Sequence, residues 1–306
     1  MSNIWFNALF QLKIHEARGT AFQDLFNKVM TAYYGDNFQT VRPWGAFGDK
    51  GNDGFLKDEQ HYFQLFAPEP TTSIRDIIKN IIKKVKDDFF KLIESYPRLK
   101  KYSFLMNDYF VGIPEFIHRE LQEISENYKI KTYAWGAHWL LNKFSELDQN
   151  KKEYILNSQP LEFTEDIAPA LIKSTLDWII KNSPLVPGPK LLDEDKKLNF
   201  EKKIKFNNLD PYFAQLLDTA YYEVDILERM LIEQPDLLQK AASILSELYK
   251  KYKKNFERID NKEDLIFVAI LENIIPKYGN ILGYRQAALI IMSKFFEACD
   301  IYEEPE

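Results

Sequence analysis

Residues 48–54 (GDKGNDG) and 62–69 (YFQLFAPE) are the two stretches from which the architecture of this chain can be inferred. The first is a glycine-rich turn, because Gly, Asn and Asp are the residues that tight turns use. The second is an apolar strand with one polar residue, Gln64, in its middle. Together they predict a turn, a short strand, a second turn and a strand. Asp53 lies at the start of the first arm of this hairpin.

The segments around the hairpin predict an α/β domain. Apolar residues at helical spacing over 21–34 and 74–89 predict two amphipathic helices. Further expected elements are strands over 38–44, 102–106 and 130–135 and helices over 114–128 and 137–147. Because strands here are followed by crossover helices, we expect a mixed sheet that is covered on both faces.

The second half of the chain is expected to be all-α. Thr164 can cap a helix that runs to about residue 181, and the Pro- and Gly-rich stretch 183–189 then breaks the chain. Four more helices are expected over 211–232, 237–256, 263–278 and 284–299. The predicted organisation is an α/β domain over 1–150, a helix and Pro/charged linker over 151–200, and a helical domain over 201–306.

Composition limits the classes of function. The chain has 306 residues and a net charge of -6, so any contact with nucleic acid needs a local basic patch. The single cysteine, Cys299, can form neither an internal disulfide nor a cysteine-based zinc site, which predicts a reducing compartment. The start of the sequence does not have the pattern of a signal peptide, and no apolar run has the length of a membrane span. We therefore expect a cytoplasmic protein without a membrane partner.

Asp53 and Gln64 are the candidate metal ligands. A metal-dependent nuclease needs oxygen ligands that hold a divalent ion against the scissile phosphate. Gln64 lies at the centre of an apolar strand and needs a polar partner, which a metal ion or an aspartate would provide. The ordinary alternative is a structural turn with Gln64 bonded to backbone, and the residues alone leave both interpretations open.

Three stretches carry a family resemblance. Residues 19–26, 48–54 and 62–69 resemble the N-terminal domain of a bacterial family whose members belong to ABC-three-component defence systems. That domain is similar to the restriction-endonuclease-like PD-(D/E)xK superfamily, and the expected order of helices and strands agrees with its core. Residues 200–209 resemble the start of the family's C-terminal helical domain.

The resemblance implies roles for individual residues. Asp53 matches the superfamily's metal-binding aspartate, and Gln64 matches its Asp/Glu position. Phe66 stands where the superfamily has its lysine, and it can neither position water nor stabilise charge. The implied cofactor is Mg²⁺.

Neighbouring residues are candidates for the missing functions. Lys50 or Lys57, from the adjoining turns, would replace the lysine. Asp49 would be a second metal ligand, and Glu16, expected just before the first helix, would supply an outer acidic group. The catalytic set that follows from the resemblance is Asp53, Gln64, Asp49 and Lys50.

Three functions follow. The first is a Mg²⁺-dependent nuclease of a defence system that cuts DNA. The second, favoured by Phe66, is an inactive nuclease fold that binds DNA or a partner ATPase as a scaffold. The third assigns the function to the helical domain, which would bind an NTPase of the same operon. Homo-oligomeric assembly is left open.

Other chemistry is less well supported. The four histidines have no metal-ligand spacing, and the chain has no phosphate-binding loop of the Walker type. Basic runs lie at 79–86 and 250–254, and a solvated helix face is the ordinary interpretation of both. In the second run, Tyr249, Tyr252 and Phe256 are interleaved with the lysines, a pattern that would suit a phosphate backbone.

Overall fold

The computed structural model describes residues 2–41, 50–68, 74–163, 167–183, 200–232, 235–279, 281–298 and 300–305. The chain divides into two compact units. An α/β unit comprises Leu9–Gln159, and a helical unit comprises Pro160–Glu306 together with Met1–Ala8. The first residues of the chain thus belong with the helical unit, although they precede the α/β unit in sequence.

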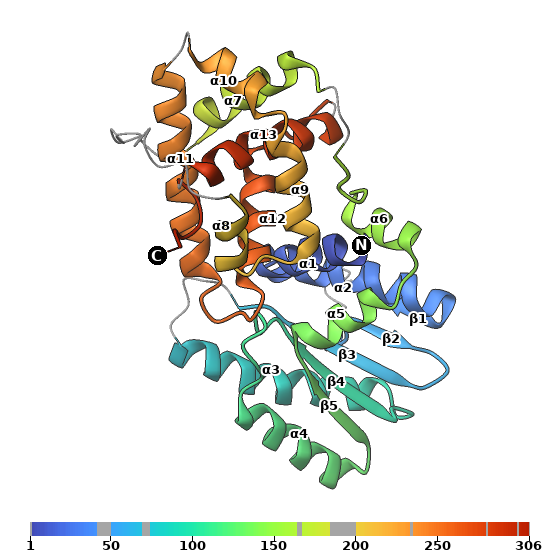
Figure 1. Ribbon diagram of the computed structural model, residues 1–306. Helices are drawn as coiled ribbons and strands as arrows, with labels where there is room; N and C mark the ends of the chain where they lie inside the picture. Colours follow the sequence, from blue (N-terminus) through green and yellow to red (C-terminus); the bar gives the residue numbers. More distant parts are fainter. Residues whose placement is uncertain are drawn as a thin grey trace. The chain divides into compact units, whose positions relative to one another are not determined.

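The α/β unit is built on a five-stranded mixed sheet (Figure 1). Its strands, in the order in which they lie side by side, are β1 (Phe38–Thr40), β2 (Gly54–Leu56), β3 (His61–Phe66), β4 (Lys101–Met106) and β5 (Lys131–Trp135). The first two neighbouring pairs are antiparallel, and the last two are parallel. The hairpin predicted from the sequence is β2–β3, with Gly54 opposite Phe63.

Helices cover both faces of the sheet, as the succession of strands and crossover helices predicted. On one face Phe63 lies 5.5 Å from the ring of Phe26 in α2 (Gly19–Tyr34) and 6.5 Å from Trp139 in α5 (Ala137–Ser145). The opposite face packs against α3 (Ile74–Ser95) and α4 (Glu115–Tyr128). Two further elements, the turn η1 (Gly35–Asn37) and the helix α6 (Gln149–Leu156), complete the unit.

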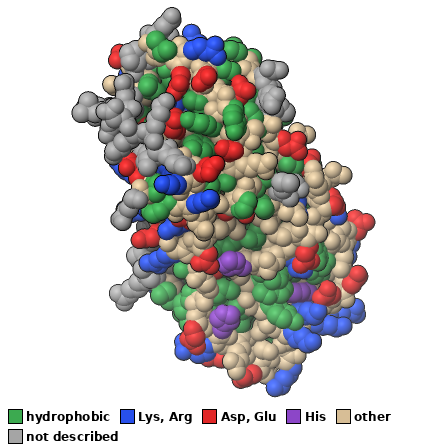
Figure 2. All heavy atoms as spheres, viewed as in Figure 1, with side chains coloured by type: hydrophobic (Ala, Val, Ile, Leu, Met, Phe, Trp, Pro, Cys, Tyr) green, Lys and Arg blue, Asp and Glu red, His purple; other side chains and the backbone are tan. Residues whose placement is uncertain are grey.

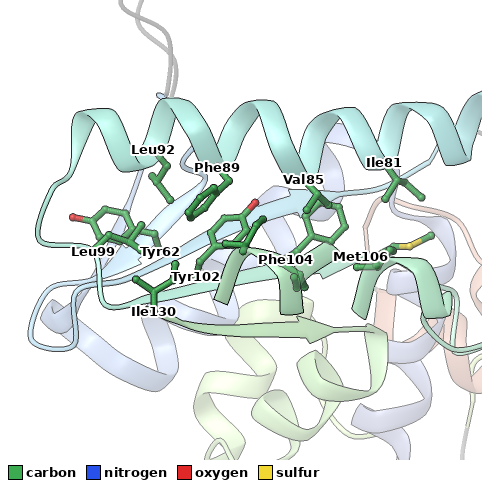
Figure 3. Close-up of a cluster of buried hydrophobic side chains, with 13 residues drawn as sticks. Tyr62, Ile81, Val85, Phe89, Leu92, Leu99, Tyr102, Phe104, Met106 and Ile130 are labelled. Carbon is green, nitrogen blue, oxygen red and sulfur yellow. The ribbon is translucent and has the colours of Figure 1, made fainter. Parts of the chain in front are cut away.

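The core between α3 and the sheet follows helical and strand periodicity. Figure 3 shows four apolar side chains of α3 pointing down onto alternate residues of β3 and β4. The residues in contact are Ile81, Val85, Phe89 and Leu92 from α3 with Tyr62, Tyr102, Phe104 and Met106 from the strands. Removing such side chains from water supplies most of the stabilisation that holds the helix to the sheet.

The helical unit is organised around one almost fully buried helix, α13 (Ile281–Glu297). It packs against α7 (Pro169–Asn182), α9 (Pro211–Tyr221), α10 (Val224–Ile232) and α12 (Lys262–Ile274). The remaining helices are α8 (Phe200–Phe206) and α11 (Pro235–Asn255).

A buried lysine ties α8 to the end of the chain. The Lys203 ammonium donates to the backbone oxygens of Phe296 at 2.6 Å and Ile301 at 2.8 Å. Because these bonds satisfy a buried charge, they fix the segment after α13 against α8.

Several expected elements differ from those observed. The helix α1 (Ser2–Glu16) was not predicted, because it is apolar on several sides and shows no single stripe. Glu16 therefore ends a helix instead of preceding the first one. The helix expected over 211–232 is two helices, α9 and α10, and the helix expected from Thr164 begins at Pro169. Thr164 and residues 42–44 lie outside the described residues.

Over the described ranges, no helix has both the length and the apolar character that crossing a bilayer requires.

Gly51 allows a close approach between the turn before β2 and the backbone of α3. Its φ is +74°, and a Cβ added there would lie 2.3 Å from the carbonyl oxygen of Asp88. We expect Gly51→Ala to lower the free energy of unfolding by about 2–4 kcal/mol, from left-handed strain plus steric clash. Urea titration, monitored by tryptophan fluorescence, measures this change in the free energy of unfolding.

The matched control is Gly35→Ala. Gly35 has a φ of +57°, but nothing lies within 4 Å of the added Cβ. Its ψ of -137° gives a conformation that L side chains rarely adopt, so the substitution should cost only this backbone strain, about 1–2 kcal/mol. Equal losses of unfolding free energy in Gly51→Ala and Gly35→Ala would contradict the close approach of Gly51 to the backbone of α3.

His61 makes the stability of the α/β unit depend on pH. Burial lowers the pKa of His61 to about 4, and its Nε2 lies 2.7 Å from the Ser103 hydroxyl. Because the folded pKa lies below the unfolded value of 6.5, the stabilisation is present above pH 6.5 and is lost as pH falls toward 4. The expected loss at pH 5 is about 2 kcal/mol.

We expect His61→Gln to remove this part of the pH dependence in unfolding measured between pH 7 and pH 5. His118→Gln is the control, because His118 is exposed on α4. A pH profile that His61→Gln leaves unchanged would contradict the assignment.

Candidate functional site

Asp53 is the centre of the candidate site. Its side chain is 7% exposed and lies immediately before β2. Oδ1 accepts a hydrogen bond from Gln23 Nε2 at 2.9 Å. Oδ2 accepts from Gln64 Nε2 and from the backbone N–H of Leu65, each at 2.7 Å. An ionised carboxylate only accepts, so these N–H donors match its charged form.

Gln64 presents a second oxygen beside this carboxylate. The side chain is 2% exposed, and its Oε1 accepts no hydrogen bond within the described part of the chain. A buried acceptor without a donor costs free energy comparable to a lost hydrogen bond. The pair Asp53 and Gln64 therefore combines a charged oxygen ligand with an unsatisfied neutral one.

The turn before β2 is built to hold Asp53 in place. The buried Asn52 accepts from the backbone N–H of Gly54 at 3.0 Å, which closes an Asx-type turn around Asp53. The Asp53 N–H itself donates to the Phe63 carbonyl at 2.9 Å. Backbone and side chain of Asp53 thus both bond to β3.

A buried tyrosine lies within the electrostatic reach of the site. Burial raises the pKa of the Tyr102 hydroxyl well above its usual value, and the charges of Asp88 and Asp53 raise it further. The hydroxyl forms no hydrogen bond to another described residue. Tyr102 therefore stays neutral and cannot serve as a base in the physiological pH range.

Phe66 occupies the position at which the resemblance expects a lysine. It points to the face of the sheet that α3 and α4 cover, where its ring stacks on Phe104 with centroids 6.3 Å apart. This position therefore makes an apolar contact and carries no cation.

The other candidates do not join Asp53 in the described structure. Lys50 is exposed in the turn before β2, with a φ of +58°, and Lys57 is exposed in the turn after it. Glu16 is an exposed residue at the end of α1 and pairs with Lys13 at 3.7 Å. Asp49 lies outside the described residues.

Gln23 is the functional-site residue that the sequence did not reveal. It lies on α2 one position after Phe22, at the border of the apolar stripe, and it is partly exposed. Nothing in the sequence distinguishes it from an ordinary surface glutamine. It is the side chain through which Asp53 is linked to the helix.

The described residues contain no group of three His, Cys, Asp or Glu side chains that could hold a metal ion. A divalent ion at Asp53 would have only this carboxylate and the amide oxygen of Gln64 as candidate ligands among these residues, and water would complete its coordination. Mg²⁺ commonly keeps several waters and uses one or two carboxylates, so a sparse oxygen set of this kind fits it.

The comparisons with known proteins concern the helical unit. Residues 174–303 match C-terminal domain 10 of the ABC-three component (ABC-3C) systems. The match indicates a component of an ABC-3C antiphage defence system. It begins within α7, ahead of residues 200–209, where the resemblance placed the start of this domain. Comparison with the curated proteins gave no match, and comparison with the solved structures gave none.

The aromatic residues interleaved with the basic run at 250–254 are not exposed. Tyr249, Tyr252 and Phe256 are buried. Lys250 pairs with Glu247 at 2.7 Å, and Lys253 pairs with Glu303 at 2.5 Å. The alternation of lysines and aromatic residues over 249–256 is therefore that of an amphipathic helix, and its aromatic rings are not available to stack on a nucleic acid.

We expect Asp53 to stabilise the fold, independently of any activity. In Asp53→Asn, an NH₂ group would replace one of two oxygens that accept from N–H donors. We expect the free energy of unfolding to fall by about 2–3 kcal/mol, because a buried donor would then face a donor.

Urea titration measures the change, and Asp58→Asn serves as the control. Asp58 is exposed in the turn after β2, so its replacement should change the free energy by less than about 0.5 kcal/mol. A similar stability of both variants would show that Asp53 does not hold the hairpin.

Proposed function

We propose that this protein is the nuclease-like component of an ABC-3C defence system and that its α/β unit acts on DNA. The observation that carries the proposal is the pair Asp53 and Gln64, which meet at 2.7 Å while the amide oxygen of Gln64 has no donor among the described residues. The order of helices and strands around them agrees with the restriction-endonuclease-like core that the sequence resembles.

The two residues would hold Mg²⁺ through the Asp53 carboxylate and the Gln64 amide oxygen. A divalent ion at such a site supplies neutralisation of phosphate charge and a water of lowered pKa. Gln64 presents its amide nitrogen to Asp53, and this nitrogen bonds to the carboxylate in the absence of a cation. A half-turn of the amide would bring its oxygen toward Asp53, which is favourable only when a cation lies between the two oxygens.

A second function has an observation of its own. Phe66 packs on Phe104 where a catalytic lysine is expected, and the N–H donors around Asp53 satisfy both of its oxygens. These features would suit an α/β unit kept as a scaffold that binds DNA or a partner without cutting. In the matched domain, the side chains of Tyr222, Ile232 and Tyr278 are 79%, 77% and 63% exposed and would be available to a partner. The partner of this proposal is the system's ATPase.

Plasmid cleavage by the purified full-length protein separates the two functions. With Mg²⁺ or Mn²⁺ we expect supercoiled DNA to be nicked, and with EDTA we expect it to stay intact. Asp53→Asn and Gln64→Met should each lower the rate at least about 100-fold, because each removes one of two protein ligands. Asp58→Asn should cut at the wild-type rate.

Metal binding gives a second readout that does not need activity. Mn²⁺ should raise the melting temperature of the wild type and of Asp58→Asn, but not of Gln64→Met, because binding to the folded state alone stabilises it. Cleavage that persists in Asp53→Asn and Gln64→Met would sink the assignment of the ligands. The absence of both cleavage and metal stabilisation in the wild type would favour the scaffold.

A further inference from the structure

The amino ends of β4 and β5 carry a concentration of positive charge. The segments that lead into these strands, residues 96–101 (YPRLKK) and 129–131 (KIK), hold five basic residues and no acidic one. The structure brings the two segments together, because Lys131 lies opposite Lys101 in the sheet and its N–H donates to the Lys100 carbonyl at 3.0 Å.

Most of this charge is available to a ligand. Lys101 pairs with Glu59 at 2.5 Å, and this pair is neutral. The other four residues, here called the basic patch, are exposed and form no ion pair with the described part of the chain: Arg98, Lys100, Lys129 and Lys131. Figure 2 shows Lys and Arg side chains gathered at the lower right of the molecule, over the α/β unit. A local excess of this kind stands out in a chain of net charge -6.

An array of stacked aromatic rings begins beside the basic patch. Trp139 of α5 stacks on Trp135 of β5 with centroids 4.0 Å apart, and Trp135 stacks on Tyr133 at 5.1 Å. We call these three side chains the aromatic ladder. All three are partly exposed, and none belongs to the fully buried core.

The ladder leads toward the patch. Lys131, Tyr133 and Trp135 alternate along β5, so all three point to the same face of the sheet. Tyr133 is the last ring of the ladder on the side of Lys131, and β5 is the edge strand. An exposed edge thus presents a ring and a row of cations within a few residues of each other.

We propose that the basic patch and the aromatic ladder bind single-stranded nucleic acid. A base stacks on Tyr133 at the end of the ladder, and the backbone passes over the amino ends of β4 and β5, where Lys131 and Lys100 contact its phosphates. Such a combination of cations along a backbone path with aromatic stacking surfaces is how sequence-independent single-strand binding is achieved. A paired duplex hides the faces of its bases, so the ladder selects unpaired strands. This inference rests on the proposed action on DNA, but it needs neither Asp53 nor cleavage.

Fluorescence anisotropy with the full-length protein tests the site, using a labelled 20-nucleotide oligo-dT, an oligo-U and a 20-base-pair DNA duplex as probes. We expect the single strands to bind at least about fivefold more tightly than the duplex in low salt. The double variant Lys100→Gln, Lys131→Gln should weaken single-strand binding about tenfold. It should also reduce the slope of log affinity against log salt by about 1.4, or ~0.7 for each lost phosphate contact.

Tyr133→Leu tests the stacking separately from the charge. It keeps apolar bulk in the sheet but removes the ring, and we expect about tenfold weaker binding with an unchanged salt slope. The binding of oligo-dT should also change the tryptophan emission of the wild type, because Trp135 lies next to Tyr133 in the ladder.

Matched controls carry the same changes elsewhere in the α/β unit. Lys79→Gln with Lys83→Gln removes two exposed lysines of α3, and Tyr154→Leu removes a tyrosine of α6 that is 80% exposed. All should bind like the wild type. The wild type should keep single-strand binding in EDTA, which stops cleavage, so failure of this proposal is distinguishable from failure of the nuclease assignment.

Four outcomes would overturn the proposal. They are no binding of either single strand, tighter binding of the duplex, equal losses in the control variants, and wild-type affinity in both Tyr133→Leu and the double lysine variant.

Discussion

The carboxylate of Asp53 is the interaction on which the α/β unit depends. It accepts hydrogen bonds from a helix side chain, a strand side chain and a strand backbone, and so joins α2, the turn before β2, and β3. The strands β1 and β2 have only three residues each. Strands so short make few ladder bonds and are marginal alone. A buried charge with matched donors therefore does what backbone pairing cannot do here, which is to hold β2 in one position against β3.

The same carboxylate is the proposed metal ligand, and Gln64 reconciles the two roles. A glutamate at position 64 would place two negative charges within hydrogen-bond distance, and the hairpin would then need a cation or a proton to be stable. A glutamine offers a donor when no cation is present and an oxygen when one is. The proposed site would therefore serve both roles, at the cost of one buried oxygen that accepts no hydrogen bond from the described residues. Phe66, packed on Phe104, offers no cation to compensate that charge.

Elements with a clear periodicity could be predicted from the sequence, and elements set by tertiary context could not. The hairpin, the succession of strands along the chain and the amphipathic helices α3 and α4 follow from alternation and helical spacing. By contrast, α1 is apolar on several sides, and the division between α9 and α10 at residues 222–223 contains neither Gly nor Pro. The meeting of Asp53 and Gln64 could be inferred because a hairpin places them on adjacent strands. The hydrogen bond from Gln23 to Asp53 could not be inferred, because it depends on how α2 packs against the sheet, and no local sequence pattern indicates that packing.

Asp53 and the basic patch lie toward opposite ends of the parallel strands. Asp53 bonds to Leu65, near the carboxyl end of β3, whereas the basic patch lies at the amino ends of β4 and β5. A local basic region on an acidic chain attracts a polyanion over a distance, so the proposed strand would be drawn to the basic patch and not to Asp53. Binding and any chemistry at Asp53 would then be separate events on one rigid frame. Exposed lysines could change at little cost to the fold, whereas Asp53 could not. The patch residues make no ion pair in the described structure, so substitutions there would change the binding of nucleic acid without disturbing the hairpin. The Asp53 carboxylate, by contrast, makes contacts that the sheet requires.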